Sequence, residues 1–306
     1  MNSIVHIPDG FLSTPVWASL DAAAVPAIGY MARRAQRDFD GAKIPMLGVM
    51  GAFVFAAQMI NFPVGVGTTA HLLGGALLAC TLGPAAAVVT MASILAIQAL
   101  VFQDGGILAL GPNMINMAFA GVLAGYLPYM LWGGGRWRRA AIFAGGALSA
   151  MVSAALALSE LLLSGVRMTL SVLLTALALF LVAALMEGAI TVAVIGALER
   201  IQPNFIRRPQ QGRPFAAGAV ALGALLLATV GVLVASAAPD GIQRLGIQTG
   251  IAARAQSLIS TPFAGYQAAF LQTAWERKVV GGLAGLVLVT CACLIFSRVA
   301  ARKRSA

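Results

Sequence analysis

Long apolar segments recur along the whole chain, separated by short polar, basic or glycine- and proline-containing stretches. Because a helix needs about 20 mainly apolar residues to cross a bilayer, the pattern predicts an all-α transmembrane bundle of about nine spans. Only Gly83-Pro84 separates the third and fourth spans, which indicates a tight turn between two antiparallel helices. The predicted spans are 15–33, 43–60, 70–83, 85–102, 112–132, 139–162, 169–198, 215–237 and 279–297.

The composition agrees with a membrane protein. Of the 306 residues, 60% are hydrophobic and only 10% are charged, and the mean hydropathy is +0.90. Soluble domains carry about 25% charged residues, and disordered chains have low hydrophobicity, so both classes are excluded. The three cysteines show no CxxC spacing, and the sequence therefore gives no support to a disulfide framework or a cysteine-based zinc site.

The net charge of +10 is explained by membrane topology rather than by nucleic-acid binding. Membrane proteins keep Lys and Arg on the cytoplasmic side. An extracytoplasmic N-terminus and a cytoplasmic C-terminus place most basic residues inside, and the predicted location is the inner cell membrane. The basic residues left outside by this topology are Arg167, Arg244, Arg254, Arg277 and Lys278.

The chain divides at one polar, basic and proline-rich stretch. We expect a seven-span domain over residues 1–199, a cytoplasmic linker over 200–214 and a two-span C-terminal domain over 215–306. The C-terminal domain carries a long outside loop. That loop contains Pro239-Asp-Gly241, which echoes Pro8-Asp-Gly10 near the N-terminus on the same side of the membrane.

The sequence lacks the common motifs of catalysis. It contains no GxxxxGK[ST], GxSxG or HExxH, so we expect a protein without its own ATPase site and not an enzyme. Asp21, Glu160 and Glu187 are the acidic residues within the predicted spans, and Glu187 lies deepest. An intramembrane carboxylate is a candidate for substrate binding or ion coupling, with a structural hydrogen bond as the alternative.

The chain has only two histidines, and the predicted topology places both outside. His6 belongs to the N-terminal segment Val-His-Ile-Pro-Asp-Gly-Phe-Leu. His71 follows a glycine- and proline-containing loop over 61–70 that can fold back as a cap over the bundle. From the residues alone, two readings stay open: hydrogen-bonded polar histidines, or ligands of a metal ion.

Three segments resemble the CbiM/NikM family, the substrate-binding membrane components of energy-coupling-factor transporters for cobalt and nickel. The segments are His6-Ile-Pro-Asp-Gly-Phe-Leu-Ser, Asn61-Phe-Pro through His71-Leu-Leu-Gly-Gly, and Phe102-Gln-Asp-Gly-Gly through Gly-Pro-Asn113. The resemblance covers roughly residues 5–200. The tail resembles the extra domain fused to some members, which opens with a PDGLE motif; here Pro239-Asp-Gly is followed by Ile-Gln243.

The resemblance implies a metal site. In the family the mature chain begins Met-His, and the terminal amine, the amide nitrogen of the His and its imidazole chelate the metal. A second His, matching His71, supplies the fourth nitrogen. Four nitrogens in a plane suit Ni(II), and Cu(II) equally well. Side chains around the ligands normally orient them. The candidates for that role are Asn61, Thr68, Gln103, Asp104 and Asn116, whereas Asp9 is better suited to capping.

The sequence departs from the family at its start, because His6 is not the second residue. One hypothesis is that translation begins at Val5 through a GTG codon, so that this initiator residue supplies the terminal amine. The other is that the extension is real and that His6 and His71 bind metal with other donors. We favour the first, and a native N-terminal peptide containing Asn2 and Ser3 would refute it.

The resemblance therefore implies the metal-capture subunit of an uptake system. Its transported substrate is Ni(II) or Co(II), with no covalently bound cofactor. The Ile-Pro-Asp-Gly sequence after His6 resembles nickel-type members, which slightly favours nickel over cobalt as the substrate. The implied partners are a transmembrane coupling (T) protein and two cytoplasmic ATPase subunits. The alternative is a secondary metal transporter, driven by an ion gradient through Glu187.

Overall fold

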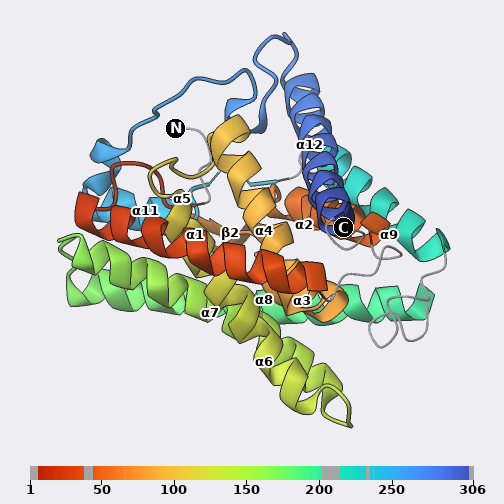
Figure 1. The fold of residues 1–306 in the computed structure, drawn as a ribbon. Coiled ribbons are helices and arrows are strands. Elements are labelled where there is room, and N and C mark those ends of the chain that lie inside the picture. Colours follow the sequence, from red (N-terminus) through yellow and green to blue (C-terminus); the bar gives the residue numbers. More distant parts are fainter. Residues whose placement is uncertain are drawn as a thin grey trace.

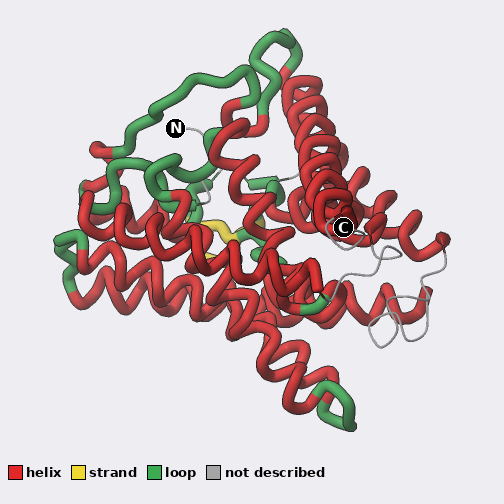
Figure 2. Tube along the Cα trace, in the orientation of Figure 1, coloured by secondary structure: helices red, strands yellow, loops and turns green. Residues whose placement is uncertain are grey.

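A computed structural model describes residues 6–37, 44–65, 67–201, 214–231, 235–236 and 238–302. Helices dominate this part of the chain, with one short two-stranded sheet near the middle of the molecule (Figures 1 and 2). The longer elements are α1 (Thr14–Arg37), α2 (Ile44–Gln58), β1 (Phe62–Gly65), β2 (Thr68–Ala70), α3 (Gly75–Leu82), α4 (Pro84–Ile97), α5 (Leu110–Asn113), α6 (Val122–Trp132), α7 (Arg138–Leu163), α8 (Leu170–Ile201), α9 (Pro214–Leu226), α11 (Gly241–Thr249) and α12 (Ala274–Arg302). Short π or 3-10 turns are η2 (Gln98–Phe102), η3 (Met114–Gly121), η5 (Leu227–Gly231), η6 (Ile251–Arg254) and η7 (Ala264–Tyr266).

The structure confirms a helical membrane protein. Among the described residues, five helical stretches are long and apolar enough to cross a membrane. The helices α2 and α9 with η5 are apolar but shorter. The full count of nine spans and the orientation of the termini stay predictions. The five stretches are Pro84–Phe102, Leu110–Trp132, Arg138–Leu163, Leu170–Ile201 and Ala274–Phe296.

The predicted span over 70–83 needs a correction. It contains only the eight-residue helix α3, which at 1.5 Å per residue is about 12 Å long and cannot cross a hydrocarbon core of about 30 Å. Its first residues instead belong to β2 and the following loop. The tight turn after it is confirmed, since Gly83 alone separates α3 from α4. Gly83 has φ 83°, a conformation that glycine adopts readily, and Pro84 begins α4.

The loop before His71 is more regular than the sequence predicts. Strands β1 and β2 form an antiparallel pair in which Phe62 pairs with Ala70 and Gly65 with Thr68. The β-branched pair Thr68 and Thr69 is buried in this strand. The all-α prediction therefore misses a small sheet, whose second strand leads directly to His71.

The helices pack around a core made by α2, α3 and α4. Its fully buried side chains include Met50, Phe55, Leu77 and Met91. The long helices α7 and α8 run side by side, whereas α6 projects away from the bundle (Figure 1). Helix α12 packs closely on α2, where a Cβ added at Gly51 would meet the Cys293 side chain at 3.1 Å. The C-terminal part is thus packed directly on the N-terminal bundle.

The two ends of α7 meet different parts of the chain. At its start, Arg138 forms an ion pair with Glu199 near the end of α8. Just beyond its end, the Ser164 hydroxyl accepts a hydrogen bond from the Ser13 backbone N–H at 3.0 Å. The N-terminal segment and the basic start of α7 therefore lie at opposite ends, as the predicted topology requires. Of the predicted linker over 200–214, α8 includes 200–201, α9 begins at 214, and the rest lies outside the described residues.

Candidate metal centre

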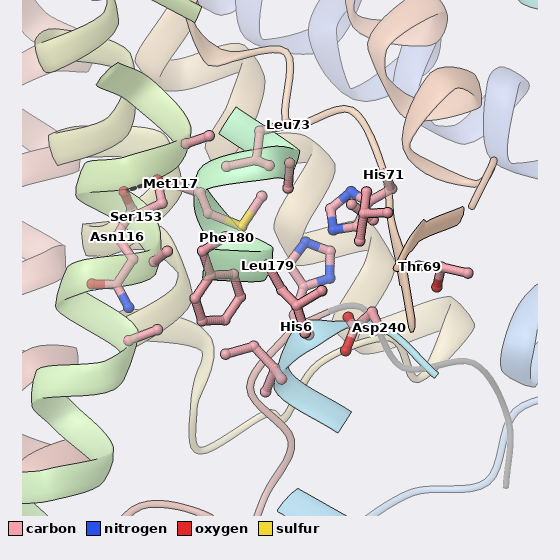
Figure 3. Close-up of a pocket in the computed structure, with 18 of the residues that line it drawn as sticks. His6, Thr69, His71, Leu73, Asn116, Met117, Ser153, Leu179, Phe180 and Asp240 are labelled. Carbon is pink, nitrogen blue, oxygen red and sulfur yellow. Dashed lines mark hydrogen bonds between the residues drawn. The ribbon is translucent and has the colours of Figure 1, made fainter. Parts of the chain in front are cut away.

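The two histidines line one cavity of about 100 Å³. The N-terminal segment supplies His6, and the end of the hairpin supplies His71. The wall opposite them comes from η3, α7 and α8, and the Pro-Asp-Gly turn of the C-terminal part adds Asp240 (Figure 3). Residues more than 230 positions apart in the sequence thus share one site.

The His6 imidazole is buried and lacks hydrogen bonds. Its residue is 3% exposed, and neither ring nitrogen has a hydrogen-bond partner. Its Nδ1 lies 3.2 Å from Oδ1 of the buried Asp104 carboxylate, an ion-pair distance. Buried polar atoms are nearly always hydrogen-bonded, so the buried Nε2 calls for a partner, and a bound ion is one that would satisfy it.

His71 faces His6 with a defined tautomer. Its Nδ1 lies 3.0 Å from the Leu72 carbonyl oxygen. A carbonyl only accepts, so this nitrogen carries the proton and the Nε2 lone pair is free. His71 lies in the loop between β2 and α3, where burial and then the neighbouring His6 charge lower the pKa of its imidazole to about 4. The neutral imidazole is the form that binds metal ions.

The separation of the rings suits one shared ion. The ring centroids are 6.0 Å apart, with an angle of 49° between the planes. Metal–imidazole bonds are about 2.0–2.1 Å long, so one ion can lie between the two rings after a small adjustment. Within the described residues, no group of three or more His, Cys, Asp or Glu side chains surrounds one point suited to a metal.

The segment that carries His6 is clamped by α5 and by the loop after η2. The Asn113 side chain, at the end of α5, accepts from the Ile7 N–H at 3.1 Å and donates to the Ile7 carbonyl at 3.1 Å. The Gly106 N–H of the loop donates to the same carbonyl at 2.9 Å. Three hydrogen bonds therefore hold the residue next to His6 in place.

Two features bring this loop against the N-terminal segment. Asp9 accepts hydrogen bonds from the N–H groups of Ile107, Leu108 and Ala109 at 2.8–3.3 Å. The carboxylate thus binds a distant backbone instead of turning its own segment. Gly105 has φ 95°, and an added Cβ would lie 2.9 Å from the His6 Cβ. Only glycine fits this contact and this backbone conformation.

The segment after His71 is anchored by the membrane helices. The Glu187 carboxylate, 1% exposed in α8, accepts from the Leu73 and Gly74 N–H groups, each at 2.8 Å. Gln58 of α2 donates to the Leu73 carbonyl at 2.7 Å. Both oxygens of the deepest predicted carboxylate therefore serve as a structural anchor.

The five residues expected around the ligands fall into two groups. Asp104 contacts His6, while Thr68 and Asn116 line the cavity. Gln103 instead donates to the Ile259 carbonyl of the C-terminal part, and Asn61 is buried but does not line the cavity. Val5, the expected source of the terminal amine, lies outside the described residues.

The structure adds three residues that the sequence did not single out for the site. Asn113 clamps Ile7, Asp240 lines the cavity, and Tyr266 donates a hydrogen bond to Asp104. Burial, and then the nearby Asp104 charge, raise the pKa of Asp240 well above its usual value. Asp240 had a sequence signal in the repeated Pro-Asp-Gly, and Asn113 ends one of the segments that resemble the family, whereas Tyr266 had none.

Comparisons with known proteins agree with this architecture. A family described as "Cobalt uptake substrate-specific transmembrane region" (CbiM) matches residues 6–205. A putative fused nickel transport protein NikMN of Archaeoglobus fulgidus is 37% identical over 76% of this chain and 74% of its own length. The fused nickel transport protein NikMN of Rhodobacter capsulatus is 32% identical over 93% and 95%.

Two solved structures of transition metal transporters are also similar to this chain. A crystal structure of a truncated transition metal transporter is 37% identical and has a TM-score of 0.57, with 64% of this chain and 98% of that chain covered. A second crystal structure, of a transition metal transporter, is 35% identical with a TM-score of 0.58, over 67% and 98%. The chain belongs to the CbiM/NikM family of metal transport proteins and carries a fused C-terminal NikN-like part.

Proposed function

We propose that this chain captures a divalent nickel or cobalt ion on the outer side of the cell (inner) membrane and passes it inward. The proposed ligands are His6 and His71, with the His6 amide and a terminal amine on residue 5 completing a set of four nitrogens. One observation carries the proposal: the buried His6 ring, with no hydrogen bond at Nε2 and only the Asp104 carboxylate beside Nδ1, shares one cavity with the His71 ring, whose centroid lies 6.0 Å away.

Nickel is the favoured substrate. Four nitrogens in a plane suit Ni(II), and neutral imidazole with a deprotonated amide matches this ion by ligand type. The names of three relatives refer to nickel transport, whereas others refer to cobalt. The clamp on Ile7 supports such a chelate, because it fixes the backbone beside His6 through two hydrogen bonds to Asn113.

Energy for transport comes from partners in this proposal. The sequence contains no P-loop, so a membrane coupling protein and two cytoplasmic ATPase subunits supply ATP hydrolysis, as in an energy-coupling-factor importer. We also propose that residues 1–199 bind and carry the metal, that 200–214 link the parts, and that 215–306 form an accessory domain. Removing the ATPase in an uptake assay tests the partnership directly.

The decisive experiment is metal retention by purified protein. Two forms are compared, one starting at Val5 recoded as Met and one at Met1, each exposed to equimolar nickel, cobalt, zinc and copper. We expect about one nickel per chain in the shorter form, measured by mass spectrometry, and its loss in His71→Ala. Ser93→Ala, which removes a hydroxyl bonded within α4, is the matched control. Absence of retained metal, or equal retention in His71→Ala, would contradict the proposal.

The rival function is a carrier driven by an ion gradient through Glu187. A coupling carboxylate must release and bind its ion during transport. Here both oxygens of Glu187 accept backbone hydrogen bonds that hold the His71 segment. A gradient-driven carrier keeps working without the ATPase, so uptake that survives ATPase deletion would favour the rival.

A further inference from the structure

Two glutamines lie in the apolar core between the segments that carry the two histidines. Gln58 ends α2 and Gln98 begins η2, and both residues are 0% exposed. The Gln98 Nε2 donates a hydrogen bond to the Gln58 Oε1 at 2.9 Å. Two bonded amides can be replaced by apolar side chains of the same shape at little cost in stability, so stability alone does not account for this buried pair.

Gln58 reaches the segment after His71. Its Nε2 donates to the Leu73 carbonyl oxygen at 2.7 Å. Because a carbonyl only accepts, the Gln58 amide must direct Nε2 to Leu73 and Oε1 to Gln98, and Gln98 must then present its own Nε2. The backbone after His71 therefore fixes the orientation of the Gln58 amide and, through it, the position of the Gln98 side chain.

Gln98 also holds the start of the loop that clamps the His6 segment. Its backbone carbonyl accepts hydrogen bonds from the N–H groups of Gln103 and Asp104, the latter at 2.9 Å. Gln103 has φ 54°, a conformation that residues other than glycine adopt rarely and keep only where their surroundings enforce it. Gly105 follows this turn directly and lies against the His6 Cβ. The turn that starts at Gln98 thus sets where the loop meets His6.

We propose that Gln58 and Gln98 are a pair of positioning residues that set the spacing between the two histidine segments. A path of hydrogen bonds runs from the Leu73 carbonyl through both side chains to the turn before Gly105. Neither glutamine lines the cavity. The pair fixes only the base of the loop, so the His6 segment can still open from it.

The spacing matters because one ion must reach both rings, whose centroids lie 6.0 Å apart. A binding site has to hold its ligands within about 0.5 Å of the productive geometry. The inference rests on the proposed function in this respect, because it treats both histidines as ligands. The glutamines then contribute to nickel affinity without touching the ion.

The test uses the full chain in lipid nanodiscs, with Gln98→Met, Gln58→Met and the double variant. Methionine fills a similar space without an amide. Thr81→Val is the matched control, because it removes a buried hydroxyl whose hydrogen bond stays within α3. Nickel affinity is measured by competition with a chelator. Because the chain has only two histidines, ¹⁵N-labelled histidine gives a simple NMR spectrum of both rings without metal.

We expect Gln98→Met to shift the ring resonances of both histidines, although the Gln98 backbone holds only the loop on the His6 side. Nickel affinity should fall about fivefold, the equivalent of one hydrogen bond. The double variant should match Gln58→Met within about twofold, because the Gln98 side chain acts through Gln58. Thr81→Val should leave both rings and the affinity unchanged.

Three results would overturn the inference: unmoved His71 resonances in Gln98→Met, additive losses of affinity in the double variant, or an equal loss of affinity in Thr81→Val. Gln98→Met leaves the bond between Gln58 and Leu73 in place, so it tests the link even where Gln58→Met does not fold. Wild-type protein that binds no nickel would overturn the proposed function instead, while the metal-free NMR spectra still decide whether the glutamine pair links the two segments.

Discussion

His6 and His71 reach the same cavity from elements that are held in opposite ways. His6 lies on a segment outside the helices, attached through Ile7 and Asp9 to the loop after η2 and to Asn113 at the start of the helical stretch Leu110–Trp132. His71 follows a hairpin and is itself followed by backbone fixed to α2 and α8 through Gln58 and Glu187. One ligand is therefore clamped at the end of one helical stretch, and the other is anchored between two helices of the bundle.

This difference teaches how a capture site can be both accessible and precise. A segment held by hydrogen bonds at the end of one helical stretch opens locally at lower cost than backbone anchored between two helices of the core. We expect the His6 side to control entry and release of the ion. The His71 side should determine whether the site exists at all.

Removing the anchor on the His71 side should have the largest effect. Glu187→Ala leaves the Leu73 and Gly74 N–H groups without their acceptor. Polar contacts in membrane bundles average about 0.6 kcal/mol, but a buried group left unsatisfied costs about 1–3 kcal/mol. We expect a loss of about 3 kcal/mol, a fall of roughly 10 °C in melting temperature and loss of nickel retention. Differential scanning fluorimetry in detergent measures the first two.

Glu187→Gln supplies the control for that loss. It preserves the shape and one acceptor oxygen, so stability should fall by about half as much. A Glu187→Ala protein with normal stability and normal nickel retention would show that α8 does not anchor the His71 segment.

A change at Gly105 should act on the His6 side alone. Gly105→Ala forces a Cβ against the His6 Cβ and occupies a backbone conformation with φ 95°. We expect nickel affinity to fall about 10- to 100-fold, because the ligand is displaced, with a stability cost of about 1–3 kcal/mol. Isothermal titration with nickel measures the affinity.

Gly83→Ala is the matched control for this prediction. Gly83 also has a positive φ, 83°, but an added Cβ meets nothing within 4 Å. Similar backbone strain therefore arises away from the cavity. If both variants lose affinity equally, the contact between Gly105 and His6 does not position the ligand.

The clamp on Ile7 should control the rate of release. Asn113→Ala removes two hydrogen bonds, worth about 0.5–1.5 kcal/mol each, so nickel should dissociate roughly tenfold faster. Asn113→Asp keeps the acceptor for the Ile7 N–H and loses the donor to its carbonyl, and it should lie between wild type and Asn113→Ala. Stopped-flow transfer of nickel to a chelator gives the rates. Equal dissociation rates in all three proteins would show that the hydrogen bonds to Ile7 do not control the release of nickel.

The sequence predicts the features that depend on neighbouring residues and misses those that depend on residues far apart in the chain. Apolar segment length predicts the helices, and glycine with proline predicts the turn at Gly83, because both are local properties. The hairpin of β1 and β2 was missed because both strands are short and the first contains glycine and proline. The predicted third span failed because apolar character continues from the loop into α3.

The residues of the candidate site also divide into those that the sequence indicates and those that only the fold reveals. The two histidines and Asp104 stood out because they lie in motifs that resemble a family. Tyr266 had no sequence signal. Its hydrogen bond to Asp104 joins residues 162 positions apart, and it forms only because the packing of α12 brings the loop that carries Tyr266 against the bundle. Glu187 was noticed for its depth, but its partners are backbone N–H groups, which no side-chain pattern reveals.

The smallest expected effect tests whether the hairpin depends on the C-terminal part. The Thr69 hydroxyl donates to the Ala238 carbonyl at 3.0 Å, while the Thr69 N–H donates to the Pro239 carbonyl at 2.9 Å. Thr69→Val removes only the first link and should cost about 1 kcal/mol. Nickel affinity should change less than about threefold, because Glu187 and Gln58 still hold the backbone after His71.

Thr81→Val is the matched control, since the Thr81 hydroxyl donates within its own helix, to the Leu77 carbonyl at 2.8 Å. The two variants should lose similar stability and keep similar nickel affinity in the same titration. A tenfold loss confined to Thr69→Val would mean that the C-terminal part, and not the membrane bundle, fixes the hairpin. In that case the bundle would not anchor the segment that carries His71, and the contrast between the way the two histidines are held would not stand.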